Sequence, residues 1–411
     1  MWWGWVIVAL VIIGYLGLSR RLDSLWVTAP MVFVALGAIV ADDGLGIVTI
    51  DIDGELVDVL FKATLALLLF VEAAAIKPTE VRAEAGLIGR LLGLAMPLAI
   101  ALGAAAMLVF FDVLSVWEAA VVGAILAPTD AALSQGVVSN ERVPAGVRNA
   151  LVTESGLNDG LAVPFALTFT AAALATIGIE TKGDALTFAL EQIGFGILVG
   201  IVLGALGGWL LKKAVETGWA DGEWVKYSPI AVVFLVFAGA EVIHGNEFIA
   251  AWVGGITFGY VVRPTIEHVE EFSHRVSQVL VVISFFVFGA ILLGPAFGKL
   301  TWQMVAYGLI SLALVRPLAV ALGMIGAKLQ WQTVAFLGWF GPRGIASVIL
   351  AFIVIKEAGL PGDDIIVIIM TVTVGLSVYL HGLSAVPGAN WYAAWAEQQP
   401  AGDATTEPPA A

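Results

Sequence analysis

The chain has 411 residues, of which 60% are hydrophobic and 13% are charged. Soluble domains carry about 25% charged residues, so this composition excludes an ordinary soluble domain. The net charge of −14 argues against nucleic acid as a partner. The absence of cysteine excludes disulfides, thiolate metal sites and thiol nucleophiles. Apolar blocks of roughly 20 residues suit helices that cross a bilayer. The composition therefore predicts one all-α polytopic membrane protein surrounded by lipid.

Thirteen apolar segments are predicted to form transmembrane helices. They lie near residues 2–18, 25–40, 56–76, 86–110, 116–134, 148–176, 188–211, 228–243, 247–262, 274–294, 301–326, 333–355 and 364–386. The first is not preceded by basic residues or followed by a small-residue cleavage pattern, which favours a membrane helix over a signal peptide. Residues 391–411 are rich in alanine, proline and glutamate and are predicted to form a disordered cytoplasmic tail.

The 19 basic residues predict the orientation of these helices. With the N-terminus outside, thirteen of them fall in cytoplasmic segments and three in outer segments. Membrane proteins carry an excess of lysine and arginine in cytoplasmic loops. The sequence therefore predicts an outer N-terminus and a cytoplasmic C-terminus. The remaining three, Lys62, Arg316 and Arg343, lie within predicted helices.

Two of the predicted helices are interrupted in similar ways. The fifth contains Pro128 followed by Thr129 and Asp130, and the twelfth contains the sequence Gly-Pro-Arg-Gly at residues 341–344. Proline removes a backbone donor, and glycine lowers the cost of unwinding. The interruptions are seven helices apart, which is the spacing expected of two inverted six-helix repeats joined by one linking helix. Such paired breaks point to a transporter binding site, although ordinary proline kinks are the alternative.

Asp159 is the strongest candidate for an ion-binding residue. A charge at mid-membrane costs roughly 2.5–3.5 kcal/mol on insertion scales, so a residue of this kind is expected to serve function. Ser155 lies four residues earlier and therefore faces the same side of a helix. The carboxylate and the hydroxyl supply oxygen ligands for a small alkali cation, and the carboxylate can instead bind a proton. The alternative is a structural carboxylate that caps a neighbouring helix.

Other charges within the predicted helices have more than one interpretation. Asp130 is interpreted as balancing the positive N-terminal ends of the broken helices rather than as a direct ligand, with Arg316 or Arg343 balancing the negative C-terminal ends. Glu154 lies about 140° around the helix from Asp159 and is expected to pair with one of these two arginines. Glu72 near the inner end of the third helix either lines a cytoplasmic funnel or lies at the membrane interface.

Three motifs, in this order and spacing, resemble those of the sodium/proton exchanger family of the cation:proton antiporter superfamily, and of its prokaryotic NhaP-type members above all. They read APTDAAL, TESGLNDGLAVP and GPRGIASVILAF. The resemblance implies a thirteen-helix antiporter fold of the NhaA/NhaP type over residues 1–390, without cofactors, working as a homodimer by an elevator-like movement. It also implies core helices at about 86–176 and 301–386, dimerisation helices at about 1–76 and 228–294, and a linking helix at about 188–211.

The resemblance further implies which residues hold the ion. The family's ligands correspond here to Asp159, Ser155, Thr129, Asp130 and Glu72. Its buried glutamate–arginine bridge corresponds to Glu154 with Arg316 or Arg343. Asn158 stands where electrogenic relatives carry a second aspartate, so the resemblance implies electroneutral exchange of one cation for one proton.

The expected function is exchange of Na+, with Li+ also accepted, for H+ across the cytoplasmic membrane. Exchange of K+ for H+ by the same fold is the first alternative. A cation channel is a weaker one, because the sequence contains no TVGYG-like filter. An intramembrane aspartyl protease is also disfavoured. Such a protease needs two aspartates that share a proton at close range, and the sequence has no GxGD motif.

Overall fold

The computed structural model describes residues 2–42, 44–47, 54–178, 185–220, 222–263 and 271–399. Within these ranges the chain is helical and contains no strand. In chain order the elements are α1 (Trp2–Ser24), α2 (Ala29–Val40), α3 (Glu55–Ala75), α4 (Pro78–Ala83), α5 (Ala85–Arg90), η1 (Leu91–Ala95), α6 (Met96–Phe110), α7 (Val116–Ile125), η2 (Ala131–Ser134), α8 (Gln135–Val138), α9 (Ala145–Thr176), α10 (Ala185–Glu216), α11 (Gly222–Val225), α12 (Ser228–Val242), α13 (Glu247–Val262), α14 (Glu271–Phe288), η3 (Gly289–Leu293), α15 (Gly294–Ala296), η4 (Phe297–Lys299), α16 (Trp302–Ile310), η5 (Ser311–Val315), α17 (Arg316–Gly323), α18 (Trp331–Trp339), α19 (Ile345–Ala358) and α20 (Asp363–Ala396).

The all-α polytopic membrane fold is confirmed. Every predicted transmembrane segment contains helix, and seven helices in the described ranges are long and apolar enough to cross a membrane. Four shorter apolar helices, α2, α7, α13 and the first part of α19, add to them. The count of thirteen crossings stays a prediction. The last helix extends to Ala396, so the segment assigned to the tail from Trp391 begins as helix, and residues 400–411 lie outside those described.

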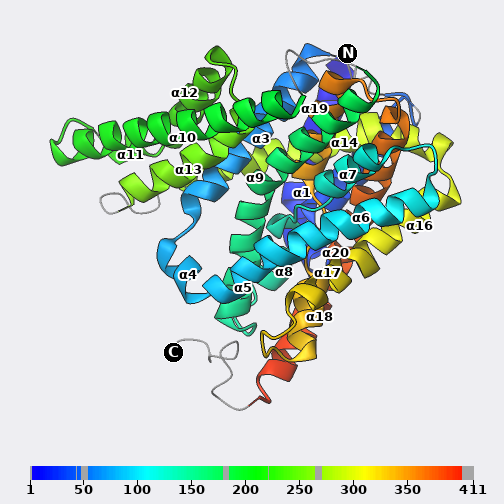
Figure 1. The fold of residues 1–411 in the computed structure, drawn as a ribbon. Coiled ribbons are helices and arrows are strands. Elements are labelled where there is room, and N and C mark those ends of the chain that lie inside the picture. The colour runs from blue at the N-terminus through cyan, green and yellow to red at the C-terminus, as the bar shows by residue number, and fades with distance from the viewer. Residues whose placement is uncertain are drawn as a thin grey trace.

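The helices form two groups on either side of α9. In one group α10 packs along α13 and α12, α13 packs on α3, and α14 packs on α2 and α3. Figure 1 shows α10, α12 and α13 extending to one side of the molecule. In the other group α6 packs on α7 and α17, and α20 packs on α16 and α19. Because α9 contacts members of both groups, it lies between them. The division into core, dimerisation and linking helices stays a prediction.

Glycines allow α10 and α13 to pack closely. A Cβ atom at Gly200 would lie 2.8 Å from Ala250 O, and one at Gly204 would lie 2.6 Å from Gly254 O. Real Cβ atoms do not approach backbone oxygens so closely, so these positions accept no side chain without movement. Small residues at four-residue spacing bring membrane helices into backbone contact in this way. This explains how a pair of largely apolar helices forms a long, close contact.

Three π-helical turns precede prolines within the membrane helices. η1 is followed by Pro97, η3 by Pro295 and η5 by Pro317. In each turn the amide after the turn donates to the carbonyl five residues back. A proline ring clashes with the carbonyl four residues earlier, and the wider π turn relieves this contact without ending the helix. Two of these turns, η1 and η5, lie in the fourth and eleventh predicted segments, again seven apart.

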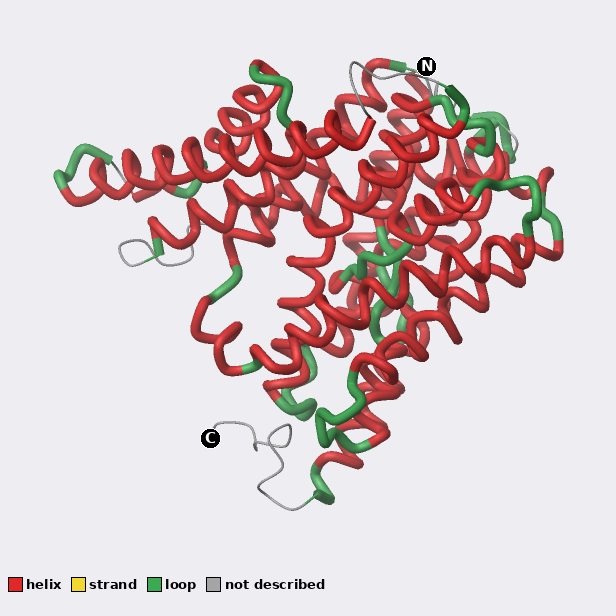
Figure 2. Tube along the Cα trace, viewed as in Figure 1, coloured by secondary structure: helices red, strands yellow, loops and turns green. Residues whose placement is uncertain are grey.

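The two predicted interruptions are present and cross each other. One break separates α7, which ends at Ile125, from η2, and the other separates α18 from α19. The amide of Asp130 in the first break donates to the carbonyl of Pro342 in the second at 2.8 Å. Figure 2 shows loop segments running through the interior of the helical bundle instead of only at its ends. A capping box of Ser115 and Glu118 fixes the start of α7, the helix that leads into the first break.

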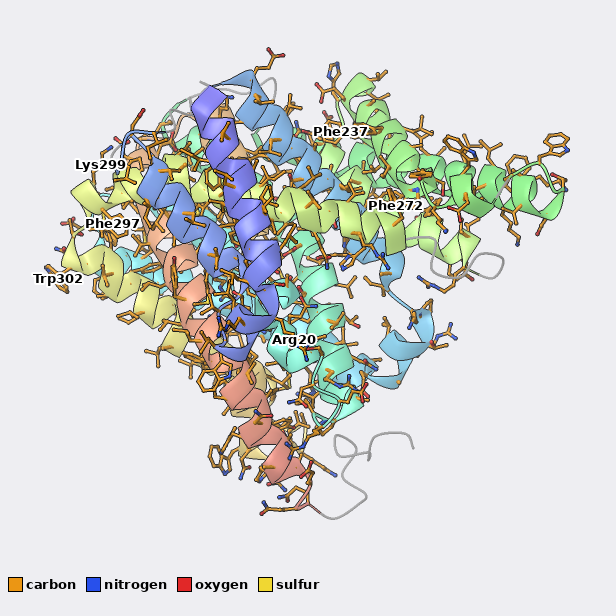
Figure 3. All side chains as sticks on the ribbon, turned by 180° about the vertical axis from the view of Figure 1, so that it is seen from behind. Arg20, Phe237, Phe272, Phe297, Lys299 and Trp302 are labelled. Atoms are coloured by element: carbon orange, nitrogen blue, oxygen red, sulfur yellow. The ribbon has the colours of Figure 1, made fainter. Side chains whose placement is uncertain are left out.

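Two basic residues that the sequence placed on opposite sides of the membrane lie apart in the structure. Figure 3 shows Lys299 with Phe297 and Trp302 at one edge of the molecule, at the turn between η4 and α16. Arg20, near the end of α1, lies well away from them. This separation is compatible with the predicted orientation, which remains a prediction.

Candidate ion-binding site

Helix α9 holds the first break through two polar side chains. The Ser155 hydroxyl donates to Thr129 O at 2.7 Å and accepts from Ala131 N at 2.9 Å. The Asn158 amide donates from Nδ2 to Thr129 Oγ1 at 2.8 Å, and its Oδ1 accepts from Thr129 N at 3.3 Å. Unwound backbone inside a membrane needs such partners, because no water is available to satisfy it. The motif on α9 therefore stabilises the broken backbone beside it.

Asp159 follows these two residues and has an unsatisfied oxygen. Its side chain is 5% exposed, and Oδ1 is buried without a hydrogen-bond partner. Glu72 of α3 lies against the same part of α9, which packs on α3. Glu72 Oε2 is likewise buried without a partner, and Cβ of Glu72 lies 3.5 Å from where a Cβ at Gly156 would be. Buried polar atoms are rarely unpaired, so these two oxygens are free to bind a cation or a proton.

Asp130 contacts the N-terminal ends of two half-helices. Oδ1 accepts from Ala132 N at 2.8 Å in η2, and Oδ2 accepts from Ile345 N at 3.3 Å at the start of α19. The first amides of a helix have no intrahelical partner and carry partial positive charge. This geometry agrees with the interpretation of Asp130 as a charge that balances helix N-termini, because both oxygens are already engaged.

Arg343 contacts the opposite ends of the broken helices. Its Nη1 donates to Gly341 O at 3.0 Å and to Pro128 O at 3.5 Å, close to the C-terminal ends of α18 and α7. The last carbonyls of a helix carry partial negative charge, which the guanidinium balances. Asp130 and Arg343 therefore neutralise opposite helix ends at the same crossing.

Glu154 pairs with Arg316, which decides between the two arginines that the sequence left open. The distance from Nη1 to Oε1 is 2.7 Å, and Nη2 donates to Oε2 at 2.9 Å. Both side chains are buried. The pair joins α9 to α17 and leaves Arg343 to its carbonyl contacts. As the helical spacing predicted, Glu154 is engaged in this pair rather than with Asp159.

Helix α9 is also contacted by α13 from the other group of helices. Trp252 Nε1 donates to Gly156 O at 3.2 Å. A Cβ atom at Gly160 would overlap the ring of Trp252, so the indole lies directly on the backbone of α9. Gly160, the residue after Asp159, allows the ring to approach. The sequence analysis did not identify Trp252, because an aromatic residue in an apolar helix gives no distinctive signal.

The structure thus gathers the predicted residues around one crossing of broken helices. Two further residues, Ser377 and His381 of α20, also contact the crossing and were missed. Among the described residues, no three acidic, histidine or cysteine side chains gather as a metal-binding cluster. An alkali cation here would therefore rely on hydroxyl and backbone oxygens beside the carboxylates.

Crossed broken helices with buried charges at mid-bundle define the class of secondary transporters built from interrupted-helix repeats. Residues 7–391 match the family described as sodium/hydrogen exchanger, transmembrane, and the chain belongs to this family. It is therefore a multi-pass membrane protein.

Individual relatives carry names that refer to two cations. The chain is 31% identical over 286 residues to the K(+)/H(+) antiporter NhaP2 of Shewanella oneidensis, covering 65% of this chain and 46% of that protein. It is 24% identical to the K(+)/H(+) antiporter NhaP of Alkalimonas amylolytica, covering 93% and 67%. It is 26% identical to a Na(+)/H(+) antiporter of Schizosaccharomyces pombe, covering 55% and 51%. The chain thus spans about half the length of the first and third of these relatives.

The fold is similar to a solved structure of the sodium proton antiporter MjNhaP1 from Methanocaldococcus jannaschii. The TM-score is 0.76 at 21% identity, and the match covers 95% of this chain and 98% of that chain. At this identity the likeness shows the fold alone. It confirms the NhaP-type antiporter fold that the three motifs predicted.

Proposed function

We propose that the protein is a secondary antiporter, not an enzyme, that exchanges a monovalent cation for H+ across the cytoplasmic membrane. The observation that carries this proposal is the unpartnered, buried oxygen of Asp159 beside the crossing of two broken helices. The proposed ligands are Asp159, Ser155, Thr129 and Glu72, and Asp130 belongs to the same ion-binding site through the negative charge that it places beside them. Family membership and the names of the relatives support antiport.

Competition for one carboxylate explains how the two ions are coupled. An empty, charged Asp159 is costly to carry through an apolar region, whereas a carboxylate neutralised by a cation or a proton is not. The site therefore changes its exposure from one side of the membrane to the other only when it is loaded. A cation bound on one side and a proton bound on the other then exchange without leakage. No resident cofactor takes part in this cycle.

Asn158 supports an electroneutral exchange of one cation for one proton. Its amide nitrogen and oxygen both bond to Thr129, and the amide carries no charge of its own. Asp159 is therefore the carboxylate of the motif that is free to bind either ion. An ion of charge +1 replaces another of charge +1, so no net charge crosses the membrane in a cycle.

Na+ is proposed as the principal cation, with Li+ as a second substrate. K+ is the specific alternative, because two of the relatives are named K(+)/H(+) antiporters. The proposal also includes a homodimer in the cytoplasmic membrane, with the N-terminus outside and the C-terminus in the cytoplasm. A cation channel is the remaining, weaker alternative, and it would give flux that neither saturates at low cation concentration nor follows a proton gradient.

Reconstitution of the purified protein into vesicles with a preset pH gradient tests the proposal. Addition of Na+ is expected to dissipate the gradient, and competition among Na+, Li+ and K+ identifies the preferred cation. Asp159→Asn should abolish the exchange while the protein remains folded. Asp112→Asn changes an exposed aspartate between α6 and α7 and should leave the exchange intact. Undiminished exchange by folded Asp159→Asn protein would refute the assignment of the site.

A further inference from the structure

We propose that Ser377 and His381 of α20 form a clamp that holds the second break and thereby positions Asp130 for ion exchange. The inference rests on the proposed function for its transport readout, but its structural basis is separate. Ser377 and His381 are 0% and 1% exposed, and both lie on the face of α20 that meets the break.

The clamp spans the break from one side to the other. Before the break, His381 Nε2 lies 2.9 Å from the carbonyl oxygen of Trp339, the last residue of α18. After the proline of the break, the amide of Arg343 donates to Ser377 Oγ at 2.6 Å. The two side chains are joined to each other, because Ser377 Oγ lies 3.2 Å from His381 Nδ1. One continuous chain of hydrogen bonds therefore connects the two half-helices.

The carbonyl partner of Nε2 determines that this nitrogen carries hydrogen. A carbonyl oxygen only accepts, so Nε2 of His381 must donate to Trp339 O. Ser377 Oγ already accepts from the Arg343 amide, and its own hydrogen can be donated to Nδ1 of His381. Nδ1 also lies 3.1 Å from Ser377 O, and this contact is not a hydrogen bond when Nδ1 accepts from the hydroxyl. The neutral form therefore satisfies the whole chain of bonds without placing another cation beside Arg343.

The orientation of the imidazole is fixed by a second contact with α18. The rings of His381 and Trp339 lie with centroids 4.9 Å apart at an interplanar angle of 30°. The indole Nε1 of Trp339 donates to Ser384 Oγ at 2.9 Å, one turn further along α20. Because the indole is held at both its face and its edge, the end of α18 has a defined position against α20.

The first break is held in the same manner by α9. There the Ser155 hydroxyl alone donates to a carbonyl within the break, Thr129 O, and accepts from the amide that begins η2, Ala131 N. At the second break the serine–histidine pair divides these two tasks. Helices α9 and α20 correspond to the sixth and thirteenth predicted segments, seven apart. Each repeat thus uses its last helix to hold its own interrupted helix.

The clamped segment in turn fixes Asp130. Pro342 O accepts from the amide of Asp130, and Ile345 N donates to its carboxylate. Pro342 belongs to the short stretch that the clamp holds between Trp339 and Arg343. Ile345 is the residue that begins α19. Release of the clamp would loosen these two contacts and, through the neighbouring Thr129, the oxygens beside Asp159. Ser377 and His381 are therefore positioning residues, because neither contacts the carboxylate of Asp159 in this arrangement of hydrogen bonds.

Cation affinity of the reconstituted protein tests the clamp. Ser377→Ala and His381→Phe should each raise the apparent KM for the cation about five- to tenfold, because a buried hydrogen bond is lost at the break. His381→Gln retains a donor and an acceptor and should restore KM to within about twofold of the wild-type value. The KM of the double variant should not exceed that of the single variant with the higher KM, because the same chain of hydrogen bonds is broken in every case.

Thr373→Val is the matched control on the same helix. It removes a buried hydroxyl that donates only to Ile369 O within α20. This variant should leave KM unchanged. An equal rise in KM for Thr373→Val, or a His381→Gln protein no better than His381→Phe, would overturn the proposal. If His381→Phe does not fold, Ser377→Ala against Thr373→Val decides the question.

Hydrogen exchange separates failure of the clamp from failure of the proposed function. The amide of Arg343 should exchange faster in Ser377→Ala than in wild-type protein, whether or not the protein transports ions, and should be unchanged in Thr373→Val. Unchanged exchange at Arg343 in Ser377→Ala would refute the clamp even if cation/proton exchange is demonstrated. Faster exchange at Arg343 in a protein that transports no cation would support the clamp and refute the proposed function.

Discussion

Glu154 and Arg316 form a bidentate ion pair, with nitrogen–oxygen distances of 2.7 and 2.9 Å, that is buried between α9 and α17. Glu154 immediately precedes Ser155, so the pair anchors the helix that carries the ion-binding candidates. Arg316 begins α17 directly after the π turn η5, and a methyl group at Gly341 would overlap its guanidinium. The pair therefore touches both the site helix and the second break.

Breaking this pair on one side should destabilise the protein strongly. Glu154→Gln leaves the buried guanidinium of Arg316 without its counter-charge, which costs roughly 3–5 kcal/mol in proteins. The double change Glu154→Gln with Arg316→Met removes both charges. It should lower the free energy of unfolding by less than the sum of the two single changes. The measurement is the midpoint of thermal unfolding in detergent. Glu223→Gln, at an exposed ion pair with Lys226 of 2.8 Å, is the control and should change little. An equal fall in the unfolding midpoint for Glu154→Gln and Glu223→Gln would contradict the prediction.

Gly344 should tolerate no side chain, because the carboxylate of Asp130 occupies the space that its Cβ atom would need. A Cβ atom there would overlap the carboxylate of Asp130, which accepts from the amide of the next residue, Ile345. Gly344→Ala should therefore displace Asp130 and reduce cation/proton exchange at least about tenfold, as a misplaced site group does. Gly89→Ala in α5 meets no atom within 4 Å and should be harmless. Vesicle transport by both variants, normalised to the amount of folded protein, is the measurement. A Gly344→Ala protein as active as the wild-type protein would disprove the prediction.

The sequence predicted the helices and the breaks because strong local signals determine both. Apolar blocks of membrane length specify spans, and proline with glycine at Pro128 and at residues 341–344 specifies the points where helices unwind. Asp159 stood out since a charge within an apolar helix is costly. The α9 motif followed from helical spacing, which puts Ser155 on the face of Asp159. All these inferences need only neighbouring residues.

The features that the sequence missed depend on contacts between distant segments. Arg316 and Arg343 are equally plausible partners of Glu154 by position, and only the packing of α17 on its neighbours selects one. His381 has no acidic neighbour in sequence, so its contact with Trp339 O gives no motif. The helix end at Ala396 was missed because alanine-rich composition after Pro387 suggests a tail, whereas packing of Tyr392 against Phe336 holds it as helix.

The C-terminal end of α20 should release its contact at acidic pH. The hydrogen bond from Arg142 holds the pKa of Glu397 below its usual value, although the exposed pair contributes little stability. A lowered pKa means that the contact is present at neutral pH and is lost as the pH falls through that lowered value. The chain has no cysteine, so Gln398→Cys allows a single spin label beside the pair. The label should gain mobility on acidification, and Glu397→Gln should show that mobility at every pH. A label equally mobile at pH 7 in both proteins would contradict the prediction.

The charge carried in one transport cycle should depend on residue 158. With Asn158, exchange is expected to be independent of an imposed membrane potential, because Asp159 is the carboxylate of the motif that is free to bind either ion. In Asn158→Asp a second carboxylate faces Thr129, whose amide and hydroxyl can still donate to it. The backbone of the break should therefore keep its shape, while the site gains one negative charge.

That added charge binds a second proton, so two protons should cross for each cation and an imposed potential should change the rate. The measurement is cation/proton exchange in vesicles whose potential, of either sign, is set by a gradient of the permeant anion thiocyanate, because K+ is itself a candidate substrate. Asp112→Asn changes the net charge by one unit in the opposite sense away from the site, and exchange by this variant should stay independent of the potential. Exchange by the wild-type protein that already responds to potential would refute the electroneutral stoichiometry but would leave Asp159 as the shared carboxylate. An Asn158→Asp protein that exchanges but ignores potential would show that residue 158 does not set the charge, because the new carboxylate then stays in one protonation state throughout the cycle.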